Sequence, residues 1–409
     1  DGYKAAGKRM PVSVAIGGDP AYTYAATAPM PDNMDEYLLA GFLRKKPVKL
    51  VKCITNDIYV PDDCDFVIEG YVDPTEPLVV EGDFGDHTGF YSLKDLYPRF
   101  HVTAITHRKD AVYPATIVGV PPQEDAYISI ATERIFLAPI RLVMQPEIVD
   151  MTMPAAGTSH NIAIISMNSR YQGQATKVTQ GMWSAGQMMF NKYLVLTPAT
   201  TDVRNSEQLA ALLRNCNVQS AVIRGEGIYD VLDHATATTG YGGKLALNLT
   251  EVTENSRKGA VSAHIALPEG VTMRTEFVEK WSTLLLFADN RLQVDLAAIA
   301  CQAGVDCNFI ALFDSRAAEA DANDLLWIAA ANTDPNRDIA LAGNCLTIDA
   351  RAKVPGDAGN PVRFPNVVTS SEEVIEAVDS RWAEYGIGEF IDSPSRKYRK
   401  LLLTDKAEW

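Results

Sequence analysis

The sequence predicts an α+β protein in which a part made mainly of short strands is followed by an α/β part. Up to about residue 170, apolar or alternating runs bounded by turn residues recur with few helical stretches between them, which favours a barrel or a curled antiparallel sheet. Beyond that point helical and extended patterns alternate, as in an α/β layer. A chain of 409 residues, 47% of them hydrophobic, is long enough for two or three domains with large cores.

The strands of the first part are predicted from short runs that end at Gly, Asp, Asn or Pro. Five runs have this pattern: 11–16, 48–54, 66–72, 100–106 and 161–166. One helix is expected among them, over 35–43, entered through Pro31-Asp32-Asn33. The second part is expected to contain helices at 176–191, from 206, at 229–235, 324–331 and 371–385, and extended segments at 193–196, 221–223 and 244–252.

Charge and composition exclude several classes of partner. The formal net charge is -15 and the pI is near 4.9, which disfavours binding to nucleic acids and anionic lipids. The sequence contains neither the pattern of a signal peptide nor an apolar run of the ~18 residues that a membrane span needs. We therefore expect a soluble cytoplasmic protein. The six cysteines are dispersed, and Cys301 and Cys307 lack neighbouring ligands for a structural zinc site.

The densest group of polar residues is the segment 81–89, EGDFGDHTG. Its glycines allow tight turns, so Glu81 and Asp86 can converge across the turn. A carboxylate pair in a partly desolvated pocket has its pKa values pushed apart, and one member can then act as a general acid. The alternative is a solvated turn in which Asp and Gly serve only the backbone.

Other candidates have simpler explanations. Glu36 lies in the first turn of the expected helix, where a carboxylate favours the helix N-terminus, worth ~0.3 to 1 kcal/mol. His160 has the setting of an ordinary structural or surface histidine. The turn 240–243 lacks the Lys-Ser/Thr of a phosphate-binding loop, and the basic run at 107–109 is followed at once by Asp110 and suits a solvated hairpin.

The order of several motifs resembles the UbiD family of reversible decarboxylases, which use prenylated flavin mononucleotide. The resemblance covers residues 1 to about 200 and 322 to about 365. The matching stretches are 11–20 (PVSVAIGGDP), 29–37 (PMPDNMDEY), 50–57 (LVKCITND) with Val60-Pro61, 81–91 (EGDFGDHTGFY), 146–150 (PEIVD), 324–327 (DLLW) and 334–338 (DPNRD).

The resemblance implies roles for the carboxylates. Glu81 and Asp86 match the second and third members of the family's Arg-Glu-Asp/Glu constellation beside the flavin, with Asp86 as the terminal acid and Glu81 as the residue that relays or positions the proton. Glu36 matches the carboxylate ligand of the Mn²⁺ or Mg²⁺ ion that bridges to the cofactor phosphate, where hard oxygen ligands are appropriate. K⁺ is a further expected ion.

The resemblance also implies the residues around the cofactor and the substrate. The backbone of Thr27, Ala28 and Pro29 is expected against the flavin, and Asp125 and Ser129 are expected to line the substrate pocket. Where the family has a phosphate-contacting Lys this chain has Cys345, and Lys353 is the expected substitute. The family's flavin-binding Arg, and the Asn and His of its metal site, precede the segment matching Lys4 onward, so we expect them upstream of Asp1.

These implications give the expected organisation and function. Residues 1–190 are expected to form a split β-barrel, flavin-binding-like cofactor and catalytic domain. Residues 191–409 are expected to form a C-terminal α/β domain with an inserted α/β unit at about 203–321, for oligomer contacts or a lid. The expected activity is decarboxylation of an aromatic or α,β-unsaturated acid, of hydroxybenzoate or naphthoate type, in ubiquinone or menaquinone biosynthesis.

The expected partners are a flavin prenyltransferase that supplies the cofactor and further copies of the chain, as a dimer or hexamer. The alternative is a non-catalytic flavin-binding or assembly protein related to the family. A hydrolase that uses only a metal is disfavoured because Glu36 lacks a set of histidine partners.

Overall fold

The chain leaves the first of two folding units at residue 84 and joins the second, returns to the first for residues 93–117, and ends in the second. Unit 1 comprises Asp1–Asp83 and Leu93–Ile117, and unit 2 comprises Phe84–Ser92 and Val118–Trp409. The computed structural model describes residues 2–31, 33–92, 94–252, 259–302, 304–353 and 364–407. The mixed α+β class expected from the sequence is confirmed.

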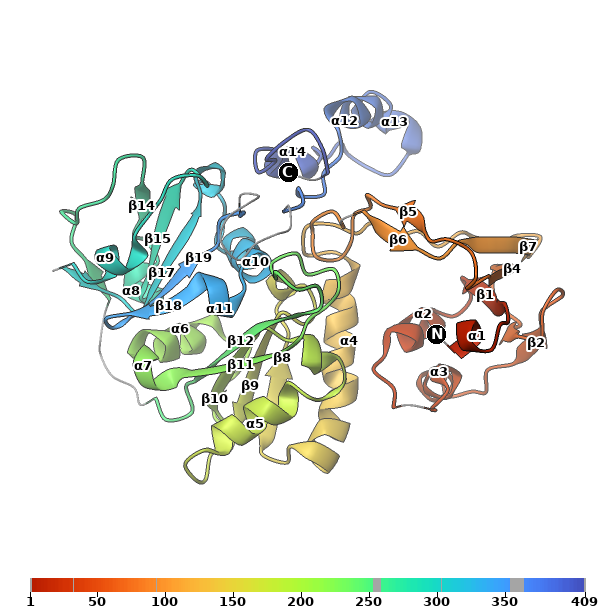
Figure 1. Cartoon of the computed structure of the whole chain (residues 1–409), viewed down its shortest axis with the longest axis horizontal. Helices are drawn as coiled ribbons and strands as arrows, with labels where there is room; N and C mark the ends of the chain where they lie inside the picture. The colour runs from red at the N-terminus through yellow and green to blue at the C-terminus, as the bar shows by residue number, and fades with distance from the viewer. Residues whose placement is uncertain are drawn as a thin grey trace. The chain divides into compact units, whose positions relative to one another are not determined.

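Unit 1 is built on an antiparallel sheet in the order β1-β4-β7, accompanied by two two-stranded ribbons, β2-β3 and β5-β6 (Figure 1). Its strands are β1 (Met10–Ile16), β2 (Leu50–Lys52), β3 (Tyr59–Pro61), β4 (Phe66–Val72), β5 (Val79–Glu81), β6 (Asp95–Tyr97) and β7 (Phe100–His107). Its helices are α1 (Gly2–Ala5), α2 (Pro20–Thr27) and α3 (Glu36–Arg44). Four of the five strands expected in the first part of the chain lie in this unit, as β1, β2, β4 and β7, and the fifth, at 161–166, belongs to unit 2. The split-barrel description stays a prediction.

Helices α2 and α3 are joined by a buried arginine. Arg44, at the end of α3, donates to Asp19 at 2.8 Å and to Asp63 at 3.0 Å, and its guanidinium lies 4.7 Å from the centre of the Tyr22 ring. Asp19 and Asp35 cap the two helices through their side chains. Asp35, rather than the expected Pro31-Asp32-Asn33 entry, precedes α3, and Asp32 lies outside the described residues.

Unit 2 contains a mixed sheet in the order β11-β12-β10-β9-β8. Its strands are β8 (Ile148–Thr152), β9 (Ile162–Met167), β10 (Tyr193–Pro198), β11 (Val222–Ile228) and β12 (Tyr241–Asn248), and its first helices are α4 (Glu124–Pro139) and α5 (Gln174–Met182). β10 runs parallel to β9 and β12, whereas the two outer strands are antiparallel to their neighbours. Val178 and Met182 of α5 pack into the core of this sheet. The expected domain boundary at 190/191 falls between two strands that pair, β9 and β10.

A second sheet of unit 2 has the order β14-β15-β17-β19-β18. Its strands are β14 (Thr272–Arg274), β15 (Thr283–Ala288), β17 (Phe309–Asp314), β18 (Ile339–Ala342) and β19 (Cys345–Asp349). Leu285 and Phe287 of β15 share a core with α10 (Ala322–Asn332), whereas Leu284 and Leu286 share another with α9 (Leu296–Ala300). This alternation is the two-residue period of a strand buried on both faces. The expected insertion therefore shares its sheet with β18 and β19, which follow it in the chain.

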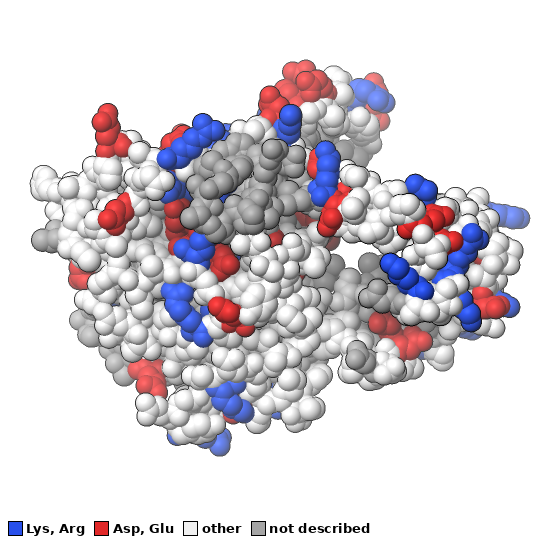
Figure 2. Space-filling model, in the orientation of Figure 1, with Lys and Arg blue, Asp and Glu red and all other residues white. Residues whose placement is uncertain are grey.

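Short elements connect and cover the two sheets. The remaining ones are π-helix η1 (Ile140–Met144), 3₁₀ turns η2 (Ala155–Gly157), η3 (Gly186–Phe190) and η4 (Ser315–Ala317), helices α6 (Ser206–Asn215), α7 (Val218–Ala221), α8 (Val278–Trp281), α11 (Pro335–Asp338), α12 (Glu372–Asp379), α13 (Trp382–Tyr385) and α14 (Ser395–Arg399), and strands β13 (Ala260–Val261) and β16 (Val305–Asp306). Val218 and Ala221 of α7 pack against residues of both sheets. None of the helices in the described ranges has the length and apolar character needed to cross a bilayer. Basic and acidic side chains are interspersed on the face shown in Figure 2.

Three helix predictions need correction. Residues 229–235 form a loop, because the Asp230 and Asp233 side chains accept the backbone N–H groups of Leu232 and Ala235, a local bonding that competes with a helix. The helix expected at 176–191 ends at Met182 and continues as η3 after a break. The helix expected at 371–385 is divided into α12 and α13. The long helix α4 was not predicted.

Two lysine side chains are buried at the sheet that contains β12, one just before β10 and one within β12. Lys192 forms an ion pair with Asp233 at 2.8 Å, and both side chains are almost fully buried. Lys244 donates to the carbonyl oxygens of Met189 and Asn191 at 2.7 and 2.6 Å. Both ammonium groups lie near the Tyr229 ring, 5.2 and 5.3 Å from its centre. Burial, with the nearby charge of Lys192, lowers the pKa of Lys244 to about 7.

The buried pair predicts a large loss of stability on removal of one partner. Asp233→Asn leaves the Lys192 ammonium buried without its counter-charge, and we expect a loss of ~3–5 kcal/mol in the free energy of unfolding. The exposed pair of Lys280 and Glu207, 2.6 Å apart, provides the control, since Glu207→Gln should cost at most ~1 kcal/mol. Urea denaturation of both variants measures the difference, and equal losses would contradict the prediction.

Lys244 predicts a specific dependence of stability on pH. Its pKa is about 7 in the folded protein and 10.5 in the reference state, so the unfolded chain binds more protons between these pH values and Lys244 makes the free energy of unfolding rise with pH. In Lys244→Met this contribution disappears, whereas the exposed Lys280→Met should retain it. Urea midpoints of both variants and wild type between pH 7 and 10 test this. A wild-type slope unchanged in Lys244→Met would refute it.

Candidate functional site

The loop 84–92 is held in one conformation by contacts within unit 2. Ser92 N–H donates to the Phe84 carbonyl at 2.7 Å, which closes the loop. The Thr88 carbonyl accepts the indole N–H of Trp327, on α10, at 2.8 Å. Gly89 has φ +83°, and a Cβ there would lie 2.7 Å from the Trp327 ring, so the position requires glycine.

A second chain segment fixes the other side of the same loop. Val368 N–H donates to the Gly89 carbonyl at 2.9 Å, and Tyr91 N–H donates to the Asn366 carbonyl at 3.0 Å. A Cβ at Gly85 would lie 2.8 Å from a methyl of Val368. The glycines of the EGDFGDHTG segment thus allow close packing, and the two residues between Gly85 and Thr88, Asp86 and His87, are presented by a rigid loop.

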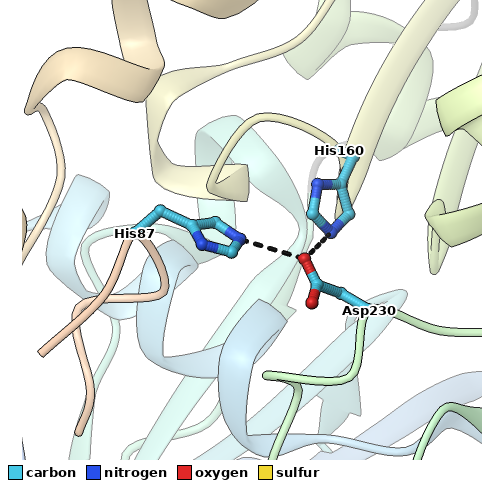
Figure 3. Close-up of side chains that lie close together, drawn as sticks. All are labelled: His87, His160 and Asp230. Atoms are coloured by element: carbon cyan, nitrogen blue, oxygen red, sulfur yellow. Dashed lines mark ion pairs between the residues drawn. The ribbon is translucent and has the colours of Figure 1, made fainter. Parts of the chain in front are cut away.

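Asp86 and His87 belong to a cluster with Asp230 and His160, and Figure 3 shows three of its members. His87 Nδ1 lies 3.0 Å from Asp86 Oδ1, and its Nε2 lies 3.2 Å from Asp230 Oδ2. His160 Nε2 approaches the same Asp230 oxygen at 3.6 Å. The two imidazoles therefore converge on one carboxylate (Figure 3).

The members of the cluster differ in their pKa values because they differ in burial and partners. Burial lowers the pKa of His87, but the hydrogen bonds to Asp230 and Asp86 outweigh it and raise the pKa to about 10. Full burial lowers the pKa of His160 to about 4. Burial raises the pKa of Asp230, but His87 and His160 overcome this and lower it to about 2. The hydrogen bond from His87 lowers the pKa of Asp86, so Asp86 favours its ionised form.

His160 is positioned by an unusual turn. Thr158 and Ser159 both have positive φ, 45° and 69°, and bring His160 back over the sheet at the start of β9. Asn191 donates to the His160 carbonyl at 2.8 Å. The imidazole lies between the rings of His87 and Phe190, each 5.7 Å away. This histidine, expected to be ordinary, is thus held at the cluster.

The expected substrate-pocket residues lie at the start of α4. Ser129 is buried and its hydroxyl donates to the Asp125 carbonyl at 2.6 Å, so this hydroxyl is used within the helix. The charge of Asp125 acts on His87. Glu124 beside it has a raised pKa, caused by burial and by the charge of Asp125. Its Oε2 is buried without a hydrogen-bond partner among the described residues, and the charges of His87 and Asp86 act on it, so this carboxyl lies near the cluster.

Glu81 and Asp86 are placed in different units. Glu81 is the last residue of β5 in unit 1 and is exposed. Asp83, also in unit 1, pairs with Lys94 at 3.4 Å. Asp86 belongs to unit 2, and the structure brings it together with His87 and Asp230.

The expected metal and flavin residues of unit 1 lie on the α2–α3 helix pair. Thr27 ends α2, Ala28 caps it, and Pro29 follows. Glu36 opens α3 with an exposed carboxylate. A hard divalent ion requires accessible oxygen ligands, and the metal role of Glu36 stays a prediction.

Lys353 is buried and hydrogen-bonded to the protein, unlike a lysine whose ammonium is free to contact a phosphate. Its ammonium is buried and donates to the carbonyl oxygens of Asp349 and Arg351, both at 2.8 Å, and lies 3.4 Å from Asp338. A lysine has three N–H donors, and these acceptors use them. The geometry therefore favours a structural role for this lysine, and contact with a phosphate stays a prediction.

Two members of the site had no signal in the sequence that pointed to it. Asp230 lies 143 positions after His87 in a segment expected to be helical, and only the fold brings it to the imidazoles. Glu124 precedes Asp125 in an unpredicted helix. The spacing of Asp230 and Asp233 could have predicted a turn in this segment, since aspartates that bond to the backbone two residues on mark turns. It does not by itself point to the site.

Two family models match most of the first part of the chain. Residues 1–121 match UbiD, the 3-octaprenyl-4-hydroxybenzoate carboxy-lyase Rift-related domain, and residues 126–249 match UbiD_C, the C-terminal domain of that carboxy-lyase. The matched ranges include Glu81 and Asp86 in the first and His160 and Asp230 in the second.

Curated relatives extend the likeness over more of the chain. An uncharacterized protein of Aquifex aeolicus is 48% identical over 248 residues, which cover 60% of this chain and 51% of the relative. An uncharacterized protein of Helicobacter pylori is 34% identical over 387 residues, 91% of this chain and 62% of the relative. The chain thus spans about half to three fifths of the length of these relatives.

Solved structures agree with the sequence comparisons. The UbiD-class enzyme HmfF of Pelotomaculum thermopropionicum, in complex with FMN, is 26% identical with a TM-score of 0.53, over 61% of this chain and 55% of that one. Vanillic acid decarboxylase of Sedimentibacter hydroxybenzoicus in its closed form is 26% identical with a TM-score of 0.56, over 66% and 57%. Sequence motifs, family models and fold lead to one conclusion: the chain belongs to the UbiD family.

Proposed function

We propose that the protein is a carboxy-lyase that decarboxylates an aromatic or α,β-unsaturated acid with the help of prenylated FMN. The observation that carries the proposal is Asp86, an acid held by the rigid 84–92 loop and by His87 within the segment that matches the UbiD family model. A second HmfF structure, 26% identical with a TM-score of 0.51, is in complex with prenylated FMN, which supports this cofactor.

The chemistry divides between the cofactor and the chain. The modified flavin supplies the electron sink for the carbon that loses CO₂. The carbon–carbon bond to the carboxyl group breaks, and a carbon–hydrogen bond forms in its place. Asp86 is proposed to deliver the proton. Asp86 gives up this proton in each turnover, and the hydrogen bond from His87 favours its ionised form. Asp86 must therefore be protonated again before the next turnover, and Glu81 is proposed to relay or position that proton.

Several residues are proposed to hold the cofactor. Glu36 would bind Mn²⁺ or Mg²⁺ beside the phosphate, and the backbone of Thr27, Ala28 and Pro29 would lie against the ring system. Asp125 and Ser129 are proposed at the substrate pocket. Lys353 is proposed to contact the phosphate, which requires its ammonium to exchange one of its three present acceptors for a phosphate oxygen. K⁺ is a further ion of the proposed site.

The finer proposals concern the setting of the reaction. We propose a hydroxybenzoate-type or naphthoate-type substrate in quinone biosynthesis, a flavin prenyltransferase as the source of the cofactor, a cytoplasmic location, and a homo-oligomer. The division into residues 1–190 with a split barrel, and residues 191–409 with an insertion at 203–321, is kept as a proposal about functional domains.

The proposed acids predict loss of turnover without loss of fold. In the full-length protein loaded with prenylated FMN and Mn²⁺, Glu81→Gln and Asp86→Asn should each lower CO₂ release from a panel of aromatic and unsaturated acids by ~10²–10⁴-fold, the usual contribution of a positioned acid. Circular dichroism should be unchanged. Asp83→Asn, which changes a carboxylate two residues from Glu81, should stay active.

Two results would reject these assignments. Turnover retained in both acid variants would remove Glu81 and Asp86 from the reaction. Flavin binding by the wild type, seen in its absorbance, without CO₂ release from any acid would favour the non-catalytic flavin-binding protein.

Glu36 predicts a separate defect in cofactor retention. Glu36→Gln removes one charged ligand of the proposed ion, so the amount of flavin that survives gel filtration in the presence of Mn²⁺ should fall by at least ~10-fold, the lower range for a perturbed metal site. Asp57→Asn, an exposed carboxylate of the same unit paired with Lys52, should retain the wild-type amount. Equal retention in the two variants would show that Glu36 is not a ligand.

A further inference from the structure

We infer that His87, His160 and Asp230 form a second metal site, one that takes Zn²⁺ or a similar late first-row divalent ion. The nitrogen and oxygen atoms that these residues offer all lie within 4.8 Å of one another. They come from three distant segments: the 84–92 loop, the turn before β9, and the loop after β11. All three belong to unit 2. The inference does not depend on the proposed decarboxylation.

The distances suit a tetrahedral ion. With bonds of ~2.0–2.1 Å to histidine nitrogen and carboxylate oxygen, neighbouring ligand atoms stand about 3.3–3.4 Å apart. Asp230 Oδ2 lies 3.2 Å from His87 Nε2 and 3.6 Å from His160 Nε2. Figure 3 shows both rings directed at that oxygen. The two histidine nitrogens lie within 4.8 Å of one another, so an ion among the three atoms would draw the two imidazoles towards each other.

Groups outside the triad already orient its ligands. His87 Nδ1 faces Asp86 Oδ1 at 3.0 Å, so Nε2 is the nitrogen directed at Asp230, and a bound ion would replace the proton that Nε2 now shares with Asp230. A carboxylate that accepts the second N–H of a metal-bound histidine is a regular feature of zinc sites. The other oxygen of Asp230, Oδ1, accepts Leu232 N–H at 2.9 Å, so Oδ2 is the oxygen presented to both histidines.

The environment of His160 gives an independent reason. Its Nε2 lies 3.6 Å from Asp230, which is too long for a hydrogen bond. The side chain is only 11% exposed, and the turn of positive φ at Thr158 and Ser159 holds it there. A buried imidazole that faces a carboxylate oxygen beyond hydrogen-bonding distance is explained by an ion between them.

The donor set indicates the class of metal and the use of the site. Two imidazoles and one carboxylate suit Zn²⁺ and its late first-row neighbours better than Mg²⁺ or Ca²⁺, which prefer oxygen. Three protein ligands leave a fourth position for water or for a ligand oxygen, as in catalytic zinc sites. The fourth position would accept water or the oxygen of a small anion, which the positive charge of the ion favours.

Zn²⁺ binding by the full-length protein, freed of metal with a chelator and prepared without flavin, tests the inference. Calorimetry and metal analysis should find about one Zn²⁺ per chain, and a Co²⁺ adduct should show the visible absorption of a tetrahedral site. His160→Gln and Asp230→Asn, which remove ligands, should each weaken Zn²⁺ binding by at least ~100-fold. Asp86→Asn should weaken it by ~10–100-fold, the range for changing a group that hydrogen-bonds to a metal-bound histidine.

One control separates this site from other histidines. His264→Gln changes an exposed histidine and should bind Zn²⁺ like the wild type. Thermal melts verify that each variant is folded. Absence of Zn²⁺ binding by the wild type at micromolar concentration, or binding unchanged in both His160→Gln and Asp230→Asn, would overturn the inference, whatever the outcome of the activity assays.

Discussion

The contact between Gly89 and Trp327 is the constraint on which the described site depends. The indole lies where a side chain at residue 89 would have to be, and its N–H holds the neighbouring carbonyl of Thr88. Trp327 is itself almost fully buried between α10 and the second sheet of unit 2. The loop that carries Asp86 and His87 is therefore fixed by the core of the protein rather than by its own turn.

In the candidate site, two carboxylates and a second imidazole surround the His87 imidazole. His87 lies between two carboxylates, Asp86 and Asp230, and a second imidazole shares the latter. An isolated charge in this half-buried setting would be costly, and mutual neutralisation makes the arrangement stable. The same geometry offers either a held acid for proton transfer or a ligand set for an ion. Both uses require that the loop, the turn before β9 and the loop after β11 keep their positions.

Local patterns in the sequence were sufficient for much of the fold. The runs at 66–72, 100–106 and 193–196 became strands because alternation and β-branched residues determine strands locally, and α3 and α10 began close to the expected residues. Residues 229–235 were expected to be helical, but the Asp230 and Asp233 side chains bond to backbone N–H groups there, and this local bonding competes with a helix. Helix α4 carries exposed apolar side chains such as Tyr127 and Ile130, so the one-sided pattern that marks most helices is missing.

Local patterns in the sequence could predict only some members of the candidate site. Asp86 and His87 stand in one conspicuous segment, but Asp230 joins them through the pairing of β11 with β12 and of β12 with β10, which no local pattern encodes. The loop is clamped by Trp327 and by Asn366 and Val368. During synthesis the loop therefore emerges long before Trp327, Asn366 and Val368, which stand in roughly the last fifth of the 409-residue sequence, and these contacts form only after translation has reached them.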